Sequence, residues 1–359
     1  MNIFLFLGRL RRRVVLTASK AALLRSVFLL AIGFIFHMIC YRIFEQVDWL
    51  TSMWVTWATF STVGYGDVSA GTLYGRLTTI VVGTAGIAVL ASFFTAFVEH
   101  KINLRDQRRF GLMDNKFKQA YVIFNFPNVF QIQTLLQEIG HVESDAKFCI
   151  VDGRLNELPP ELASQENICF VKGRVLDQAT YKRANLTASK AVIVFPVEPS
   201  VPDSDATTQT IVDLVERFAG KQTRIIHILV DPSNAFLFEK LRSVPIQESF
   251  ELFAVVQECQ DPFSSLVAER MLRNTEGANP QTVTPVKSVG LTWAQLQLQV
   301  IETGARLGIN LNPLALIRGK EIRTCPDFSE TIKTGDKLSI LAHHGFDWEK
   351  FEVEMTSKT

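Results

Sequence analysis

The chain has 359 residues, with 37 Lys and Arg against 36 Asp and Glu, and a net charge of +1. This length allows two or three domains, and the balanced charge disfavours a nucleic-acid binder that neutralises phosphates. The five cysteines are scattered and form no CxxC pair, so neither a zinc site nor a disulfide framework is indicated. A reducing compartment fits this cysteine usage.

Two apolar runs predict helices that span a lipid bilayer. The first, residues 26–41, carries no formal charge and is extended toward the N-terminus by residues 21–24. The second, residues 77–98, also lacks formal charge. At a rise of about 1.5 Å per residue, these runs and their flanks can cross a hydrocarbon core of about 30 Å. Neither run repeats arginine at every third position, so a voltage sensor is not indicated.

Residues 49–61 (WLTSMWVTWATFS) lie between the two runs and are rich in aromatic and hydroxyl side chains. This segment is too short to cross a bilayer, so we expect it to enter the membrane and return. Lys and Arg gather before the first run and after the second, whereas the segment between carries Glu45, Asp48 and Asp67. The distribution predicts that both termini are cytoplasmic and that the protein lies in the inner (plasma) membrane.

The six residues after this segment are Thr62, Val63, Gly64, Tyr65, Gly66 and Asp67. The run resembles the selectivity filter of potassium channels, where carbonyls of four identical loops replace the hydration shell of the ion. The resemblance implies that Thr62, Val63, Gly64 and Tyr65 bind potassium ions and that the chain forms a homotetramer. Gly64 and Gly66 permit the backbone conformations that such a loop needs. The alternative, a chance turn in an external loop, is disfavoured by the position between two spans.

Other residues of the pore segment have less specific interpretations. By resemblance to potassium channels, we expect Trp54, Trp57 and Tyr65 to form a cuff of aromatic side chains that holds the filter loop open. Another expectation concerns the second span, where glycine either loosens a helix or allows close packing. Its two glycines are Gly83 and Gly86.

Gly86 is the preferred gating hinge because its distance from Gly66 is similar to that in calcium-gated prokaryotic channels. Glu99 would appear four times around the cytoplasmic mouth, where it concentrates cations or is simply a solvated charge. His37, within the first span, is interpreted as a hydrogen-bonded residue that faces the helix bundle.

The remainder of the chain alternates short apolar runs, rich in Val, Ile and Phe, with segments of helical pattern. The expected strands are 121–126, 147–151, 168–171, 191–195 and 224–230, and the expected helices are 129–139, 176–184 and 205–218. This alternation predicts a parallel sheet with Rossmann-like winding. The fold class is therefore a two-span α-helical pore with a re-entrant helix, then a cytoplasmic α/β Rossmann-like domain and a small α+β C-terminal lobe.

This cytoplasmic part resembles the regulator-of-potassium-conductance (RCK) domains. The resemblance rests on residues 171–174, 204–205, 231–241, 317–322 and 334–338. It implies that the domains pair with one another and assemble into a ring that gates the pore when an intracellular ligand binds. It also implies that the segment 250–272 clasps a neighbouring copy. Met113 precedes the first expected strand, where internal initiation would supply extra free domains.

The candidate ligand cleft contains Asn125, Asp152 and Arg174. Asp152 ends the second expected strand, where an acid could hold a ribose. However, the turn after the first strand reads FNFPN and has no glycine, so NAD is disfavoured as the ligand. The acidic cluster that some relatives use for calcium is also missing. Calcium or a different nucleotide remains open as the regulator.

We expect six segments in chain order. They are a basic cytoplasmic N-terminus (1–25), the pore domain (26–99), a linker (100–118), a Rossmann-like N-lobe (119–245), a helical crossover (246–275) and a C-lobe (276–359). The predicted function is a potassium channel gated by its cytoplasmic ring. The alternatives are a channel whose ring is structural and senses no nucleotide and, much less favoured, a membrane-tethered dinucleotide enzyme, for which no catalytic group is indicated.

Overall fold

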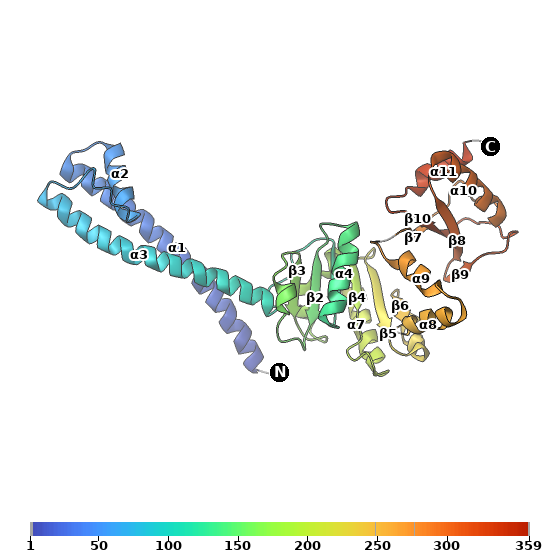
Figure 1. The fold of residues 1–359 in the computed structure, drawn as a ribbon. Coiled ribbons are helices and arrows are strands. Elements are labelled where there is room, and N and C mark those ends of the chain that lie inside the picture. The colour runs from blue at the N-terminus through green and yellow to red at the C-terminus, as the bar shows by residue number, and fades with distance from the viewer. Residues whose placement is uncertain (1–2, 248, 276, 358–359) are drawn as a thin grey trace. The chain divides into compact units, whose positions relative to one another are not determined.

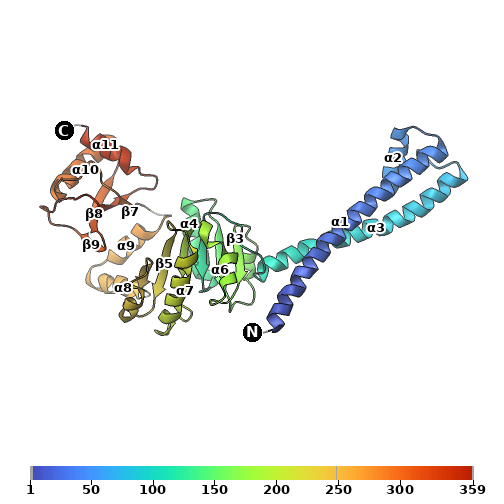
Figure 2. The same cartoon turned by 180° about the vertical axis from the view of Figure 1, so that it is seen from behind.

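The computed structural model describes residues 3–247, 249–275 and 277–357, with side chains from Ser19 onward. The chain divides into two compact units (Figures 1 and 2). One contains Met1–Met113 and Asn156–Ala163, and the other contains Asp114–Leu155 and Ser164–Thr359.

The first unit is built on three helices. They are α1 (Ile3–Glu45), α2 (Trp49–Phe60) and α3 (Leu73–Arg109). Helices α1 and α3 run side by side, and α2 lies against them where α1 ends and α3 begins (Figure 1). The stretches Ser19–Glu45 and Leu73–Arg109 are long and apolar enough to cross a membrane. Many of their large apolar side chains are exposed, as a lipid-facing surface requires.

Helix α3 continues beyond the expected end of the second span. The sequence predicted a linker from residue 100, but the helix runs without a break to Arg109. Residues 99–109 contain neither proline nor glycine, and their charged side chains are compatible with a solvated helix. The first half of the expected linker is therefore helical.

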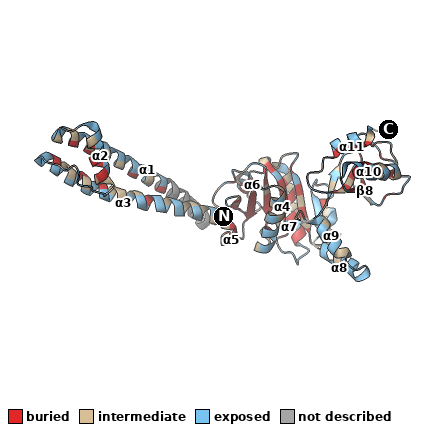
Figure 3. Ribbon diagram, turned by 45° about the horizontal axis from the view of Figure 1, so that its top comes forward, coloured by how far each residue is buried: buried red, intermediate tan, exposed pale blue. Residues whose placement is uncertain are grey.

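The second unit begins with a six-stranded parallel sheet in the order β3-β2-β1-β4-β5-β6. The strands are β1 (Ala120–Phe124), β2 (Phe148–Asp152), β3 (Ile168–Lys172), β4 (Ser189–Val194), β5 (Arg224–Leu229) and β6 (Val244–Gln247). The helices of this unit that lie between the strands in the chain are α4 (Val129–Val142), α6 (Gln178–Ala184), η1 (Leu186–Ala188), α7 (Ser204–Phe218) and η2 (Pro232–Phe238). The short helix α5 (Pro160–Ala163), between β2 and β3 in the chain, belongs to the first unit. Figure 3 shows that buried residues concentrate in the strands. The predicted Rossmann-like winding is confirmed, since the order reverses at β1 and β4.

Two details of this sheet differ from the sequence prediction. Strand β1 ends at Phe124 instead of Phe126 because Asn125 has a left-handed backbone with φ of 60°. Strand β6 was not predicted, because its residues are all exposed and it contains Pro245, which fits only the edge of a sheet.

The crossover consists of two helices, α8 (Phe250–Gln260) and α9 (Ser264–Leu272). Neither helix contains a buried residue, although both carry large apolar side chains. The C-lobe follows with an antiparallel sheet of order β7-β10-β8-β9. Its elements are β7 (Asn279–Val283), α10 (Trp293–Leu307), β8 (Leu311–Arg318), β9 (Glu321–Thr324), β10 (Lys337–Ala342) and α11 (Trp348–Thr356).

Residues 317–322 and 334–338, two of the segments that resemble RCK domains, are joined by hydrogen bonds in the structure. Arg318 at the end of β8 donates through Nε and Nη2 to the two carboxylate oxygens of the buried Asp336, at 2.8 and 2.7 Å. Arg318 also donates to Glu330 at 2.7 Å. The hydrogen bonds from Arg318 lower the pKa of Asp336. This network fixes β8 to the turn that precedes β10.

Candidate functional site

Helix α2 begins and ends through specific local contacts. The carboxylate of Asp48 accepts hydrogen bonds from the backbone N–H of Leu50 and Thr51, at 3.0 and 3.2 Å, and caps the N-terminus. The helix ends at Phe60, and Ser61 N–H donates to Trp57 O at 2.8 Å. The C-terminal end, which carries the negative end of the helix dipole, therefore lies immediately before Thr62.

The loop after α2 has an alternating backbone. Among its residues Thr62, Gly64 and Gly66 have positive φ values of 61°, 57° and 72°, whereas Val63 and Tyr65 do not. Alternation of this kind turns successive carbonyls toward one side, whereas an extended strand points them alternately to opposite sides. Gly64 N–H donates to Ala58 O at 3.2 Å, which ties the loop to α2.

The sequence predicted unusual backbone conformations at Gly64 and Gly66, but it did not predict one at Thr62. A β-branched residue rarely adopts a left-handed conformation, so surrounding contacts must hold it there. Its N–H donates to Thr59 O at 3.1 Å. The side chain of Thr62 is exposed in the single chain, as is every residue from Thr62 to Asp67. One row of carbonyls on an exposed loop is the form in which four copies could surround an ion.

Three aromatic rings support the loop from one side. The ring of Trp54 stacks on Tyr65 with centroids 5.4 Å apart and an interplanar angle of 11°. Trp54 also stacks on Trp57 at 5.4 Å and 24°. The indole Nε1 of Trp54 donates to Asp67 Oδ2 at 2.8 Å. The structure thus brings together the three side chains that the sequence predicted as a cuff.

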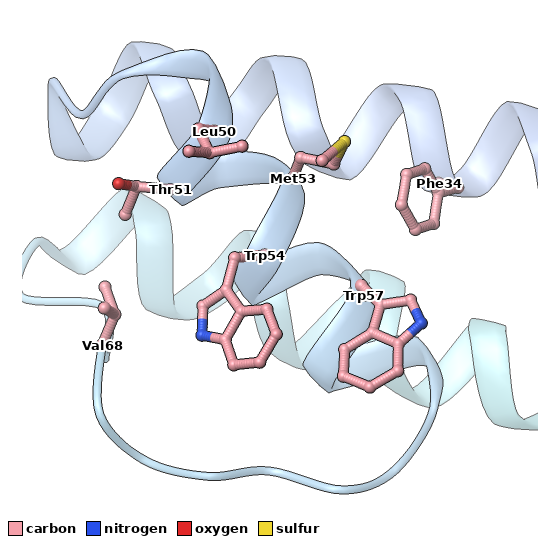
Figure 4. Close-up of a pocket in the computed structure, with 7 residues that line it drawn as sticks. All are labelled: Phe34, Leu50, Thr51, Met53, Trp54, Trp57 and Val68. Atoms are coloured by element: carbon pink, nitrogen blue, oxygen red, sulfur yellow. The ribbon is translucent and has the colours of Figure 1, made fainter.

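Trp54 and Trp57 also line an apolar cavity of about 520 Å³ (Figure 4). It is lined by residues of α1, of α2 and of the loop after the filter. They are Phe34, Leu50, Thr51, Met53, Trp54, Trp57 and Val68. The cavity is part of the exposed apolar surface of a single chain.

The two glycines predicted as a hinge are packing positions in this structure. A Cβ at Gly86 would lie 3.2 Å from Cε1 of Phe60, and a Cβ at Gly83 would lie 3.5 Å from Cγ2 of Thr59. Gly33 of α1 faces the same ring, since its Cβ would lie 3.4 Å from Cζ of Phe60. The Phe60 ring is therefore held between glycines of α1 and α3. Helix α3 runs unbroken through Gly83 and Gly86, so the hinge stays a prediction.

Glu45 connects the end of α1 to the start of α3, a role that the sequence did not reveal. Its carboxylate accepts hydrogen bonds from Gly71 N–H at 3.0 Å and from the N–H and hydroxyl of Thr72 at 3.0 and 2.8 Å. A Cβ at Gly75 would overlap Oε1 of Glu45. A side chain at position 75 would therefore displace the Glu45 carboxylate from these contacts.

Asn125 occupies the turn where many Rossmann folds have glycine. Its φ of 60° is the conformation that glycine normally supplies and that Asn tolerates best among other residues. The buried side chain donates from Nδ2 to Phe195 O at 2.7 Å, and its N–H donates to Val151 O at 3.0 Å. Asn125 therefore joins the carboxyl ends of β1, β2 and β4.

Asp152 is buried, and backbone groups already occupy both of its oxygens. Oδ2 accepts from Phe126 N–H at 2.8 Å, and Oδ1 accepts from Arg154 N–H at 2.5 Å and Leu155 N–H at 2.9 Å. The first contact lies in the turn before α4. That helix is capped by Asn128, whose Oδ1 accepts from Gln131 N–H at 2.8 Å. The amides that a pyrophosphate would use are partly engaged within the protein.

Two arginines lie near this edge of the sheet. Arg174, predicted from the sequence, is exposed after β3, and its main chain closely approaches Gly153. Arg154 was not predicted. Its Nη1 donates to Val197 O at 2.6 Å, and its Nη2 lies 3.6 Å from Asp152 Oδ2, so it reaches across the carboxyl ends of the strands. Only the tertiary fold brings residues 154 and 197 together.

Two of the predicted features remain to be described, namely Glu99 and a site for a calcium regulator. Glu99 is exposed on α3 of the single chain. Within the described ranges 3–247, 249–275 and 277–357, no three or more His, Cys, Asp or Glu side chains are grouped to hold a metal ion.

Comparison with known proteins identifies the pore segment. Residues 26–100 match the family model described as "Ion channel". Among curated proteins, the chain is similar to the calcium-gated potassium channel TvoK of Thermoplasma volcanium, with 24% identity over 172 residues that cover 47% of each protein. It is also similar to the putative potassium channel protein YugO of Bacillus subtilis, with 24% identity over 152 residues that cover 42% of this chain and 43% of that protein. The chain matches about half the length of these relatives.

Two solved structures illustrate the structural similarities. The "GsuK channel bound to NAD" has a TM-score of 0.45 and 18% identity, covering 92% of this chain and 58% of the other. The human SLO3 gating ring has a TM-score of 0.46 and 12% identity, covering 62% of this chain and 44% of the other. The fold assignment rests on the strand order of this chain itself. Residues 26–100 thus match an ion channel family model, and the chain is similar to prokaryotic potassium channels.

Proposed function

We propose that this protein is a subunit of a potassium-selective channel in which four copies surround one pore. The observation that carries the proposal is the loop Thr62–Gly66, whose φ alternates in sign directly after a short helix between two apolar helices. Four such loops would replace the hydration shell of potassium with rings of carbonyl oxygens. The exposure of Val63 and Tyr65 in the single chain supports an assembly that covers them.

The proposed channel lies in the plasma membrane, with both termini in the cytoplasm. The basic residues that flank the two spans on their inner side support this orientation. The soluble part then meets the cytoplasm and serves as a regulatory domain. We assign no enzymatic activity to the chain, because its candidate sites suit ion conduction and ligand binding.

Pairing of the cytoplasmic domains would use the crossover helices α8 and α9. Their exposed apolar residues include Phe250, Phe253, Val256, Leu266 and Val267. Surface of this kind on a soluble domain marks a contact with another chain. Extra domains that start at Met113 would allow eight copies per pore, whereas purified channel with a single band on a denaturing gel would exclude them.

The gating ligand is a separate part of the proposal. TvoK is named as calcium-gated, and GsuK has structures bound to NAD and to ADP. In this chain, the backbone contacts of Asp152 support a second candidate function, in which the ring is structural and senses no nucleotide.

Recording from purified channel in planar bilayers tests both parts. With potassium on one side and sodium on the other, the reversal potential should lie near that of potassium. Equal permeability to the two ions would overturn the proposed function. Addition of calcium, NAD or ADP to the cytoplasmic side then separates a sensing ring from a structural one, because only a sensing ring changes the open probability.

A further inference from the structure

A single histidine connects all three helices of the pore segment. His37 of α1 is fully buried, at 0% exposure. Its Nδ1 lies 2.8 Å from the hydroxyl of Thr56 on α2, and its Nε2 lies 3.2 Å from the hydroxyl of Thr79 on α3. Both nitrogens of the ring are therefore used, each toward a different helix.

The hydroxyls of the two threonines also form hydrogen bonds with the main chain of their own helices. Thr56 lies 2.7 Å from the carbonyl of Ser52, and Thr79 lies 2.9 Å from that of Gly75, in the arrangement where the hydroxyl donates to the preceding turn. A hydroxyl that donates there can only accept from the imidazole. A neutral imidazole has one N–H, so one hydroxyl must turn its hydrogen toward the bare nitrogen. The position of the ring is thus coupled to the main chain of both partner helices.

The ring also lies near the C-terminal end of α2, which leads into the loop of residues 62–67. Thr56 lies one turn before Phe60, and Phe60 lies two residues before Thr62. His37 packs near the Phe60 ring with centroids 6.3 Å apart, and Gly33 and Gly86 contact that ring from α1 and α3. Any shift of α2 along its axis would change the contacts of Phe60 with His37 and with the two glycines, and it would move Thr62.

We propose that His37 is a positioning residue for the selectivity filter, which it holds in the conducting form by fixing α2 against α1 and α3. This inference rests on the proposed function. The ring does not contact the ions, and it acts through Thr56 and the C-terminal end of α2. The outer helix thereby takes part in filter stability within each subunit.

The consequence can be measured through potassium itself. Ions bound in the conducting filter stabilise that form by mass action. A filter that has lost its support from α2 should therefore spend less time conducting at low external potassium and recover at high potassium. A defect of general packing would instead lower the yield of tetramer and would not depend on potassium.

The experiment uses the full-length channel in planar bilayers at low and high external potassium. His37→Phe keeps the size of the ring, and both threonine hydroxyls can still donate to their own helices. We expect a roughly tenfold loss of conducting time at low potassium, the size typical of one lost buried hydrogen bond, with recovery at high potassium. His37→Asn retains the position of Nδ1 and His37→Gln that of Nε2, so each should restore part of the wild-type behaviour.

Thr79→Val and Thr78→Val form a matched pair. Thr78 makes the same bond to the preceding turn, at 2.8 Å to Tyr74 O, and is half-buried like Thr79, but the hydroxyls that meet His37 are those of Thr56 and Thr79. Thr79→Val should resemble His37→Phe and add little to it in the double mutant, whereas Thr78→Val should behave as wild type. If His37→Phe does not assemble, this pair decides the question.

The outcomes separate the inference from the function. A wild-type channel that does not select potassium overturns the proposed function. A selective wild type with unchanged conduction in His37→Phe, or with a defect that potassium does not relieve, overturns the role of His37 alone. Equal effects of Thr78→Val and Thr79→Val would also overturn it.

Discussion

The indole Nε1 of Trp54 donates a hydrogen bond to Oδ2 of Asp67 at 2.8 Å, and the same ring stacks on Tyr65 at 5.4 Å. One side chain of α2 thus holds the loop of residues 62–67 at Tyr65 and at Asp67. The hydrogen bond has a charged acceptor, so it is stronger than a bond between neutral groups.

Replacement of Trp54 by Phe should destabilise the conducting filter. Phe retains a ring that can stack on Tyr65, but it loses the donor to Asp67. We expect open periods at low external potassium to shorten roughly tenfold, since hydrogen bonds to charged groups contribute about 1.5–3 kcal/mol. Single-channel recording measures this, with Trp57→Phe as the control that leaves the Asp67 bond intact. Similar open periods in the two variants would contradict a special role of that bond.

Gly86→Ala should test packing against hinge bending. The added methyl would lie 3.2 Å from the Phe60 ring, which is closer than ordinary contact, so we expect lower tetramer stability and open probability. If packing is the cause, Phe60→Leu in the same chain should relieve the defect. If bending at Gly86 is the cause, the open probability should stay low in the double variant. Gly83→Ala, with its nearest contact at 3.5 Å, is the control.

The chain should not bind NAD in the mode of a dinucleotide-binding Rossmann fold. That mode uses backbone amides at the start of the first helix, but Phe126 N–H already donates to Asp152 and Pro127 has no N–H. Calorimetry on the full channel in detergent should detect no binding at micromolar NAD. Micromolar binding that disappears in Asp152→Ala would show that the turn accommodates the cofactor. ADP, measured in parallel, tests a smaller ligand in the same cleft.

The soluble part should lose stability as the pH falls below 6.5, because of His227. This residue of β5 is fully buried and stacks on Phe238 with centroids 3.9 Å apart. Burial lowers its pKa to about 4, although the carboxylate of Asp205 opposes the shift. Between pH 6.5 and about 4, His227 therefore binds a proton in the unfolded chain but stays neutral in the folded chain.

The stabilisation is complete above pH 6.5 and falls as the pH approaches 4, by at most about 3 kcal/mol. Thermal unfolding at several pH values should show this as a falling midpoint. His227→Phe can keep the stacking but cannot titrate, so the difference between wild type and variant isolates the effect of the histidine. The same pH dependence in both proteins would assign the loss of stability to other groups.

The sequence was sufficient to predict the elements that periodicity and composition govern. The two spans, the short helix at residues 49–60 and five of the six parallel strands are present. Strand β6 could not be predicted, since Pro245 and four exposed positions give no apolar pattern. Likewise, the end of β1 depends on the left-handed Asn125, whose conformation is fixed by a carbonyl 70 residues away.

In the first unit, the sequence indicated a filter at residues 62–67, which stays a prediction, but it did not reveal the contacts that hold this loop. The contact of Phe60 with Gly33 and Gly86 joins three helices, and no local pattern encodes such a contact. The same holds for Glu45, which reaches Thr72 across 27 positions of the chain. The roles of Glu99, Gly86 and Arg174 stay predictions, because they depend on the assembled channel or on a ligand.

The inner end of α3 has a mechanical consequence. From Ile87 to Arg109 the helix contains neither glycine nor proline, so it is a stiff rod of about 35 Å. Its last residue is held by the loop before α5, where Leu158 N–H donates to Arg109 O at 2.8 Å and the Arg109 guanidinium lies 2.7 Å from Glu157. If that loop moved, the stiff helix would bend little and would transmit the movement to the contact between Gly86 and Phe60.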